Sequence, residues 1–158
     1  VAGLNIIHPY ILIADDDYEM LERYRLLLGL PDEACSSSTL DKLDDFISSL
    51  GEPEESTPEA PWEATLVEQG FDAIHTATQA KQQGTSITHA FLDMRMPPGM
   101  DGLQTAARLR ELYPQIKIIF VSAYIDHSTE EMDRVLGKAH WHFLQKPFKD
   151  EDILKLLP

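Results

Sequence analysis

The sequence predicts an α/β fold in which a doubly wound parallel sheet carries helices on both faces. Two observations indicate this fold. Five short apolar segments alternate with stretches of helical periodicity, and such alternation is typical of parallel sheets with right-handed crossovers. The apolar segments are also nearly continuous, as in strands that are covered on both faces. We expect the strand order 2-1-3-4-5, counted along the chain.

The composition limits the classes of function. The chain has 158 residues, 43% of them hydrophobic, which is enough for one domain with a sizeable core. A formal net charge of −14 argues against binding of nucleic acid or of an anionic membrane surface, and favours a bound cation or a basic partner. No apolar run reaches the ~18 residues of a membrane span, so we expect no membrane insertion. The single cysteine, Cys35, fits a reducing compartment, and we expect a cytoplasmic protein.

The first strand is expected at Tyr10–Ala14, where an apolar run stops at Asp15. A helix is expected over Tyr18–Leu28, because its apolar residues recur at the spacing of one buried helix face. The side chain of Asp17 can cap the start of this helix, and Gly29 can end it.

Residues 30–61 form an acidic, proline-rich insert between the first helix and the second strand. Apolar residues from Leu40 to Leu50 recur at helical spacing and favour a short extra helix. The stretch from Gly51 to Pro61 cannot bury enough apolar surface to order itself strongly. The insert is either a solvated linker or a docking surface for a partner, and the sequence leaves both interpretations open.

The remaining elements continue the alternation to the end of the chain. The expected strands are 62–67, 89–94, 116–121 and 141–144, and the expected helices are 70–83, 103–112, 128–136 and 150–157. Residues 71–76 could also form a strand, but the turn-like sequence at 68–70 favours a helix. The helical pattern runs on to Pro158, which indicates a truncated last helix and a piece of a longer protein.

Polar residues follow four of the expected strands at the point where each strand ends. Asp15 and Asp16 follow the first strand, and Asp93 follows the third. Ser122 and Lys146 follow the fourth and fifth strands. Because the carboxyl ends of parallel strands meet at one edge of a sheet, we expect these five side chains to share a pocket.

The chemistry of these groups favours phosphoryl transfer to an aspartate. Clustered carboxylates raise one another's pKa values unless a cation is bound, and Mg²⁺ (or Mn²⁺) prefers such oxygens and often binds together with phosphate. Lys146 can contact an anion as a point charge, and Ser122 can donate a hydrogen bond to it. With the charge neutralised in this way, Asp93 can attack a phosphoryl group and become an acyl phosphate.

At these residues the sequence resembles the receiver domains of two-component response regulators. Any single motif is weak, but four of them in order at strand ends are highly specific. The resemblance covers about residues 10 to 157, and it implies a receiver domain at 10–158 with a flavodoxin-like (βα)5 sheet. The matching motifs are Ile11-Leu12-Ile13-Ala14-Asp15-Asp16-Asp17, Leu92-Asp93-Met94-Arg95-Met96-Pro97 with Met100-Asp101-Gly102, Val121-Ser122-Ala123 and Lys146-Pro147-Phe148.

The resemblance implies a role for each acid of the pocket. Asp93 would accept phosphate from a histidine kinase or a phosphotransfer domain. Asp15, Asp16 and Asp93 would hold Mg²⁺, and the backbone carbonyl of Arg95 would complete the protein ligands.

The resemblance also implies how the phosphate is sensed. Ser122 would bond a phosphoryl oxygen, and Lys146 would pair with the phosphate. Phe143, three residues before Lys146, falls at the aromatic switch position of the family and would change rotamer as Ser122 is drawn toward the phosphate. Plain core packing is the alternative for Phe143. Tyr124 could shield the acyl phosphate from water or simply pack on the surface.

The implied protein is a signalling module of a bacterial two-component phosphorelay and not an enzyme beyond self-phosphorylation and slow autodephosphorylation. It would switch a partner or an output domain C-terminal to residue 158, and a homodimer is one of the assemblies that the resemblance allows. The insert and the long Pro97-Pro98-Gly99 turn look like the subfamily fused to sensor kinases or cyclic-di-GMP enzymes.

Two other functions compete with this one. The acidic insert and the truncated last helix fit a phosphate-independent interaction module on the same fold. A metal-dependent phosphatase with an aspartyl intermediate usually carries a second acid two residues after the nucleophile. That position is Arg95 in this chain, which argues against a phosphatase.

Overall fold

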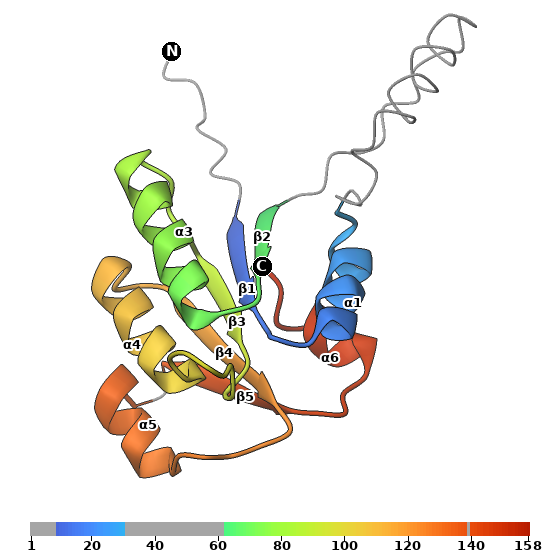
Figure 1. Ribbon diagram of the computed structural model, residues 1–158, viewed down its shortest axis with the longest axis vertical. Coiled ribbons are helices and arrows are strands. Elements are labelled where there is room, and N and C mark those ends of the chain that lie inside the picture. Colours follow the sequence, from blue (N-terminus) through green and yellow to red (C-terminus); the bar gives the residue numbers. More distant parts are fainter. Residues whose placement is uncertain (1–8, 31–61, 139) are drawn as a thin grey trace, which may run out of the picture.

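The computed structural model describes residues 9–30, 62–138 and 140–158, and it confirms the predicted doubly wound, flavodoxin-like fold. Five parallel strands form one sheet in the order β2-β1-β3-β4-β5 (Figure 1). The strands are β1 (Tyr10–Ala14), β2 (Glu63–Val67), β3 (His89–Leu92), β4 (Lys117–Ser122) and β5 (Trp141–Gln145). The helices are α1 (Tyr18–Leu28), α3 (Gly70–Gln82), α4 (Gly102–Leu112), α5 (Thr129–Leu136) and α6 (Asp150–Leu154).

The sheet separates two core layers. Helices α3, α4 and α5 cover one face, and α1 and α6 cover the other (Figure 1). Leu12, Ala90 and Phe120 pack in the layer with α3, α4 and α5, whereas Ile13 and Phe91 pack in the layer with α1 and α6. Because successive side chains of a strand point to opposite faces, a strand covered on both sides is apolar throughout. This explains the nearly continuous apolar runs of β1, β3 and β4.

Caps place three helices directly behind the strand ends. The side chain of Asp17 accepts a hydrogen bond from the backbone N–H of Glu19 at 3.0 Å, as predicted for the start of α1. Gly29 ends α1 in the left-handed conformation, with φ of 66°. Asp101 and Ser128 cap α4 and α5 in the same way. The caps satisfy backbone N–H groups that have no partner within the helix, and they hold the loops at the carboxyl edge of the sheet.

Two predictions about elements need correction. Residues 71–76 lie within α3, so the alternative strand there is wrong. The last helix ends at Leu154 instead of residue 157. Leu156 and Leu157 pack against the core layer of α1 and α6, and Leu157 precedes a proline, which disfavours a helical backbone. The other bounds differ from the predicted ones by at most two residues.

The predicted insert and its short extra helix fall mainly on residues 31–61, which lie outside the described residues. Among the helices that the structure does describe, none has the length and apolar character needed to cross a membrane.

Arg110 on α4 fastens the end of α5. Its Nη1 donates to the backbone carbonyl of Leu136 at 2.8 Å, and its Nη2 donates to the carbonyl of His140 at 2.7 Å. The last carbonyls of a helix have no partner within the helix, so Arg110 satisfies one of them. We expect Arg110→Ala to lower the free energy of unfolding by about 2 kcal/mol, because hydrogen bonds to charged groups contribute about that much.

Urea unfolding measures this loss, and Arg108→Ala is the matched control. Arg108 is an exposed arginine on the same helix, so its replacement is expected to change the free energy of unfolding by less than about 0.5 kcal/mol. Equal losses in the two variants would contradict the role given to Arg110.

Candidate functional site

Four strand ends meet at the carboxyl edge of the sheet, which is the lower edge in Figure 1. They open on a pocket of about 340 Å³. Its lining residues are Asp16, Asp17, Asp93, Arg95, Pro97, Ser122, Ala123, Tyr124 and Lys146. Asp15 is buried and is joined to this group through Lys146. The structure therefore brings together the five side chains that were predicted to converge.

Asp93 follows β3 and is the centre of the hydrogen bonds in the pocket. The hydroxyl of Ser122 donates to its Oδ1 at 2.8 Å, and Nζ of Lys146 donates to its Oδ2 at 3.2 Å. The backbone N–H of Arg95 also points to Oδ1, at 3.3 Å. Both carboxylate oxygens thus have donors, although the side chain of Asp93 keeps 10% of its surface exposed. A small reacting group could reach Asp93 from the pocket.

Asp15 is the most deeply buried acid of the site, with 1% of its surface exposed. Nζ of Lys146 donates to its Oδ2 at 2.8 Å, and the backbone N–H of Asp17 donates to its Oδ1 at 2.9 Å. Burial raises the pKa of Asp15 to about 6, and these hydrogen bonds offset only part of that effect. The pKa of Asp16 is also raised, first by burial and then by the charge of Asp93.

Asp15, Asp16 and Asp93 fit a hard divalent cation. Each offers a carboxylate oxygen, and these oxygens lie within 4.8 Å of one another. Burial is the main reason that the pKa values of Asp15 and Asp16 are raised, and the charge of Asp93 adds to it, so a bound cation would stabilise the ionised carboxylates. An all-oxygen donor set of this kind suits Mg²⁺ or Mn²⁺. Arg95 lines the pocket, and its backbone carbonyl stays a predicted ligand.

Lys146 supplies the positive charge on the other side of the pocket. Its backbone N–H donates to the carbonyl of Ser122 at 2.9 Å, which continues the pairing of β4 with β5. Burial by itself would lower the pKa of Lys146, but the hydrogen bonds and charges of Asp15 and Asp93 outweigh burial, and the pKa is raised. Lys146 is therefore an ammonium ion held between two acids.

Ser122 and Phe143, the two residues predicted to sense the phosphate, have different surroundings in the structure. Ser122 is fully buried, contacts Asp93 and also accepts from the backbone N–H of Tyr124 at 3.3 Å, and its contact with a phosphate stays a prediction. Phe143 pairs with Phe120 in the β4–β5 register and packs, partly buried, against the core layer of α3, α4 and α5. Its role as a switch stays a prediction.

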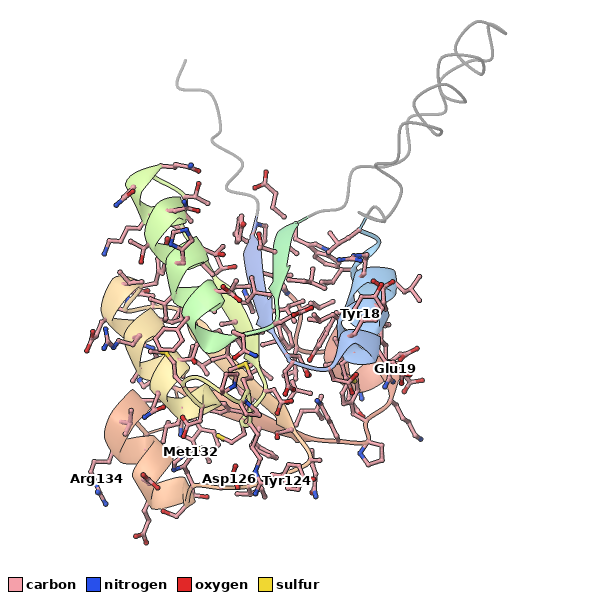
Figure 2. The ribbon with its side chains drawn as sticks, viewed as in Figure 1. Tyr18, Glu19, Tyr124, Asp126, Met132 and Arg134 are labelled. Atoms are coloured by element: carbon pink, nitrogen blue, oxygen red, sulfur yellow. The ribbon has the colours of Figure 1, made fainter. Side chains whose placement is uncertain are left out.

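The sequence did not reveal the rim of the pocket. The guanidinium of Arg95 makes two hydrogen bonds to the carboxylate of Asp126, at 2.8 and 2.6 Å. It also lies 3.8 Å from the ring centroid of Tyr124, a cation–π contact. Figure 2 labels Tyr124 and Asp126 on the loop between β4 and α5. Arg95 and Asp126 are 31 residues apart, and no spacing rule links them.

The chain matches a known protein family over most of its described residues. A sequence model of the family described as "Response regulator receiver domain" matches residues 59–158. The match begins near the end of the insert, but β1 and α1, which precede the insert, belong to the same sheet and core.

Three solved structures illustrate the structural similarity. The fold is similar to a response regulator receiver protein from Sinorhizobium medicae WSM419 at 22% identity and a TM-score of 0.58, covering 93% of this chain and 89% of that chain. It is similar to the signal receiver domain of an HD domain-containing protein from Pseudomonas fluorescens Pf-5 at 18% identity and a TM-score of 0.60, covering 94% of this chain and 90% of that chain. It is also similar to the signal receiver domain of a modulated diguanylate cyclase from Desulfovibrio desulfuricans G20 at 20% identity and a TM-score of 0.58, covering 93% of this chain and 88% of that chain.

Proposed function

As a chain that belongs to the response regulator receiver domain family, this protein is a signalling module of a two-component system, and we propose that Asp93 is its phosphoacceptor. The observation that carries the proposal is the set of donors on Asp93. Its two carboxylate oxygens accept hydrogen bonds from Ser122 and Lys146 inside a cluster of acids suited to a divalent cation. Such a site neutralises the charge that develops on a transferring phosphoryl group.

The reaction forms one bond and breaks one. An oxygen of Asp93 attacks the phosphorus of a phosphohistidine, the P–N bond breaks, and the imidazole of the donor keeps the electron pair and takes a proton. Lys146 turns from Asp93 to the phosphate while it keeps its contact with Asp15. Ser122 donates to a phosphoryl oxygen instead of to Asp93. Mg²⁺ held by Asp15, Asp16, Asp93 and the backbone carbonyl of Arg95 would neutralise phosphoryl charge.

The side chain of Arg95 argues against a phosphatase. An enzyme with an aspartyl intermediate needs a general acid near the leaving group. Arg95 occupies the position two residues after Asp93, and its guanidinium is paired with Asp126. The hydrogen bonds to Asp126 raise the already high pKa of the Arg95 guanidinium, so this side chain is a poor proton donor at neutral pH. We therefore propose that the domain carries out self-phosphorylation and slow autodephosphorylation only.

The partners of the domain are proposed from similarity. Two of the similar receiver structures come from an HD domain-containing protein and from a diguanylate cyclase. We propose that a histidine kinase or a phosphotransfer domain supplies the phosphate to a receiver domain at 10–158. The output, in a segment after residue 158 or in a partner, would be a cyclic-di-GMP enzyme or a kinase. The Pro97-Pro98-Gly99 turn and the insert at 30–61 support this subfamily.

Labelling of the purified chain with radioactive acetyl phosphate tests the function. We expect the chain to take up label with Mg²⁺ or Mn²⁺ and to take up none with EDTA, because the acids of the pocket need a cation before a phosphate can approach. Circular dichroism confirms that the EDTA sample is folded. A folded chain that stays unlabelled with Mg²⁺, both by acetyl phosphate and by a panel of histidine kinases, would overturn the proposal.

A further inference from the structure

Two neighbouring residues of the loop between β4 and α5, Asp126 and His127, make side-chain contacts with other parts of the protein. Asp126 pairs with Arg95, at the rim of the Asp93 pocket. His127 lies between two carboxylates from different helices. Its Nε2 is 3.0 Å from Oδ2 of Asp101 at the start of α4, and its Nδ1 is 3.0 Å from Oε2 of Glu131 in the first turn of α5.

These two contacts require a charged histidine. An ionised carboxylate only accepts hydrogen bonds, and a neutral imidazole carries a proton on one nitrogen only. Both nitrogens of His127 face carboxylates, so both donate only when the ring is an imidazolium. Oδ1 of Asp101 is already occupied, because it accepts from the backbone N–H of Gln104 as the cap of α4. Loss of one proton from His127 therefore breaks at least one of the two contacts.

The charges around His127 favour the imidazolium. Burial by itself would lower the pKa of His127, but hydrogen bonds to Asp101 and Glu131 and their charges outweigh burial, and the pKa is raised. Asp126 is its neighbour on the loop, and its negative charge is paired with Arg95. The groups that face His127 are thus one acid from α4, one from α5 and one from its own loop.

The same loop begins at the pocket. Ser122 ends β4, and Ala123 and Tyr124 line the pocket around Asp93. We propose that His127 is a positioning residue that, in its charged form, holds the loop between β4 and α5 closed beside Asp93. We call the two contacts of His127 with Asp101 and Glu131 the clasp. The clasp is complete below the ordinary histidine pKa of about 6.5 and is lost as the pH rises through the raised pKa of the folded state. The loop then loses at least one of its two side-chain contacts with α4 and α5, and water gains access to the pocket.

An NMR pH titration of the unphosphorylated chain tests the clasp without any assumption about phosphorylation. We expect the ring of His127 to titrate above the ordinary histidine value, and the amide signals of Tyr124 and Glu131 to shift with the same midpoint. Asp101→Asn keeps the cap of α4 but removes a charge, so it should lower that midpoint. His127→Gln should abolish the amide titration, whereas the control His142→Gln, at an exposed position on β5, should retain it.

A His127 midpoint at or below the ordinary value, or loop amides that do not follow it, would overturn the clasp. A second measurement rests on the proposed function and follows the loss of phosphate from labelled protein. We expect His127→Gln to lose phosphate several-fold faster than the wild type at a pH well below the midpoint. The ratio of the two rates should fall to one well above the midpoint.

The NMR titration and the phosphate-loss measurement distinguish a failure of the proposed function from a failure of the clasp. A wild type that cannot be labelled defeats the proposed function, while the NMR titration still decides whether the clasp exists. A labelled protein whose rate ratio is one at every pH would overturn the positioning role of His127, even where the titration shows a raised midpoint.

Discussion

Asp93→Asn is expected to abolish labelling by acetyl phosphate. The amide has nearly the shape of the carboxylate and can still accept from Ser122, but it is not a nucleophile that forms an acyl phosphate. We expect the rate of labelling in Mg²⁺ to fall by about 10³-fold or more, the scale seen when a nucleophile is removed. The measurement is incorporation of radioactive phosphate, with unfolding in urea to show that the variant is folded.

Asp72→Asn is the matched control for this variant. Asp72 is an exposed acid in the first turn of α3, so the same change of charge and shape takes place away from the pocket. Labelling of the control should equal that of the wild type. If Asp93→Asn were labelled as well as Asp72→Asn, the phosphoacceptor would be another residue.

Asp15→Asn is expected to increase the free energy of unfolding at neutral pH when no metal is bound. This is the second large effect. The pKa of Asp15 is raised from 3.8 to about 6, so the folded state binds this proton more tightly than the unfolded chain does. Stability is therefore lost as the pH rises through the interval between these two values. The loss at neutral pH is about 3 kcal/mol, at about 1.4 kcal/mol for each pKa unit. The neutral amide of the Asp15→Asn variant avoids this loss of stability.

Urea unfolding in EDTA at neutral pH measures this effect, and we expect Asp15→Asn to be more stable than the wild type by up to about 3 kcal/mol. Addition of Mg²⁺ at about a thousand times its Kd should reverse the order. Ligand at that concentration stabilises a folded protein by about 4.1 kcal/mol, and the variant lacks one of the three acids that would bind it.

Asp17→Asn is the control for Asp15→Asn. It removes an acid two residues away and keeps an oxygen that can cap α1, so its free energy of unfolding in EDTA should stay within about 0.5 kcal/mol of the wild type. An Asp15→Asn variant that is less stable than the wild type in EDTA would show that the contact of Asp15 with Lys146 outweighs the burial of its charge.

The sequence predicted the centre of the site well and its rim poorly. Asp15, Asp93 and Ser122 could be placed together because each follows an apolar strand, and parallel strands bring their carboxyl ends to one edge. Arg95 was predicted only for its backbone carbonyl, and its side-chain pairing with Asp126 had no signal in the sequence. The same is true of the contact between His127 and Asp101. Arg95, Asp126 and His127 lie in loops, whose side chains follow neither the strand period nor the helix period.

By itself, the sequence determined the order of the elements and the identity of the residues at the strand ends, for which local periodicity is enough. The strand order was an expectation that the tertiary structure confirmed, because right-handed crossovers allow more than one order. Only the tertiary structure decided that Lys146 is shared between Asp15 and Asp93, that Asp15 and Asp16 carry raised pKa values, and that His127 joins α4 to α5. Hydrogen bonds and pKa values depend on burial and on distances between side chains, and these exist only once the helices have packed on the sheet.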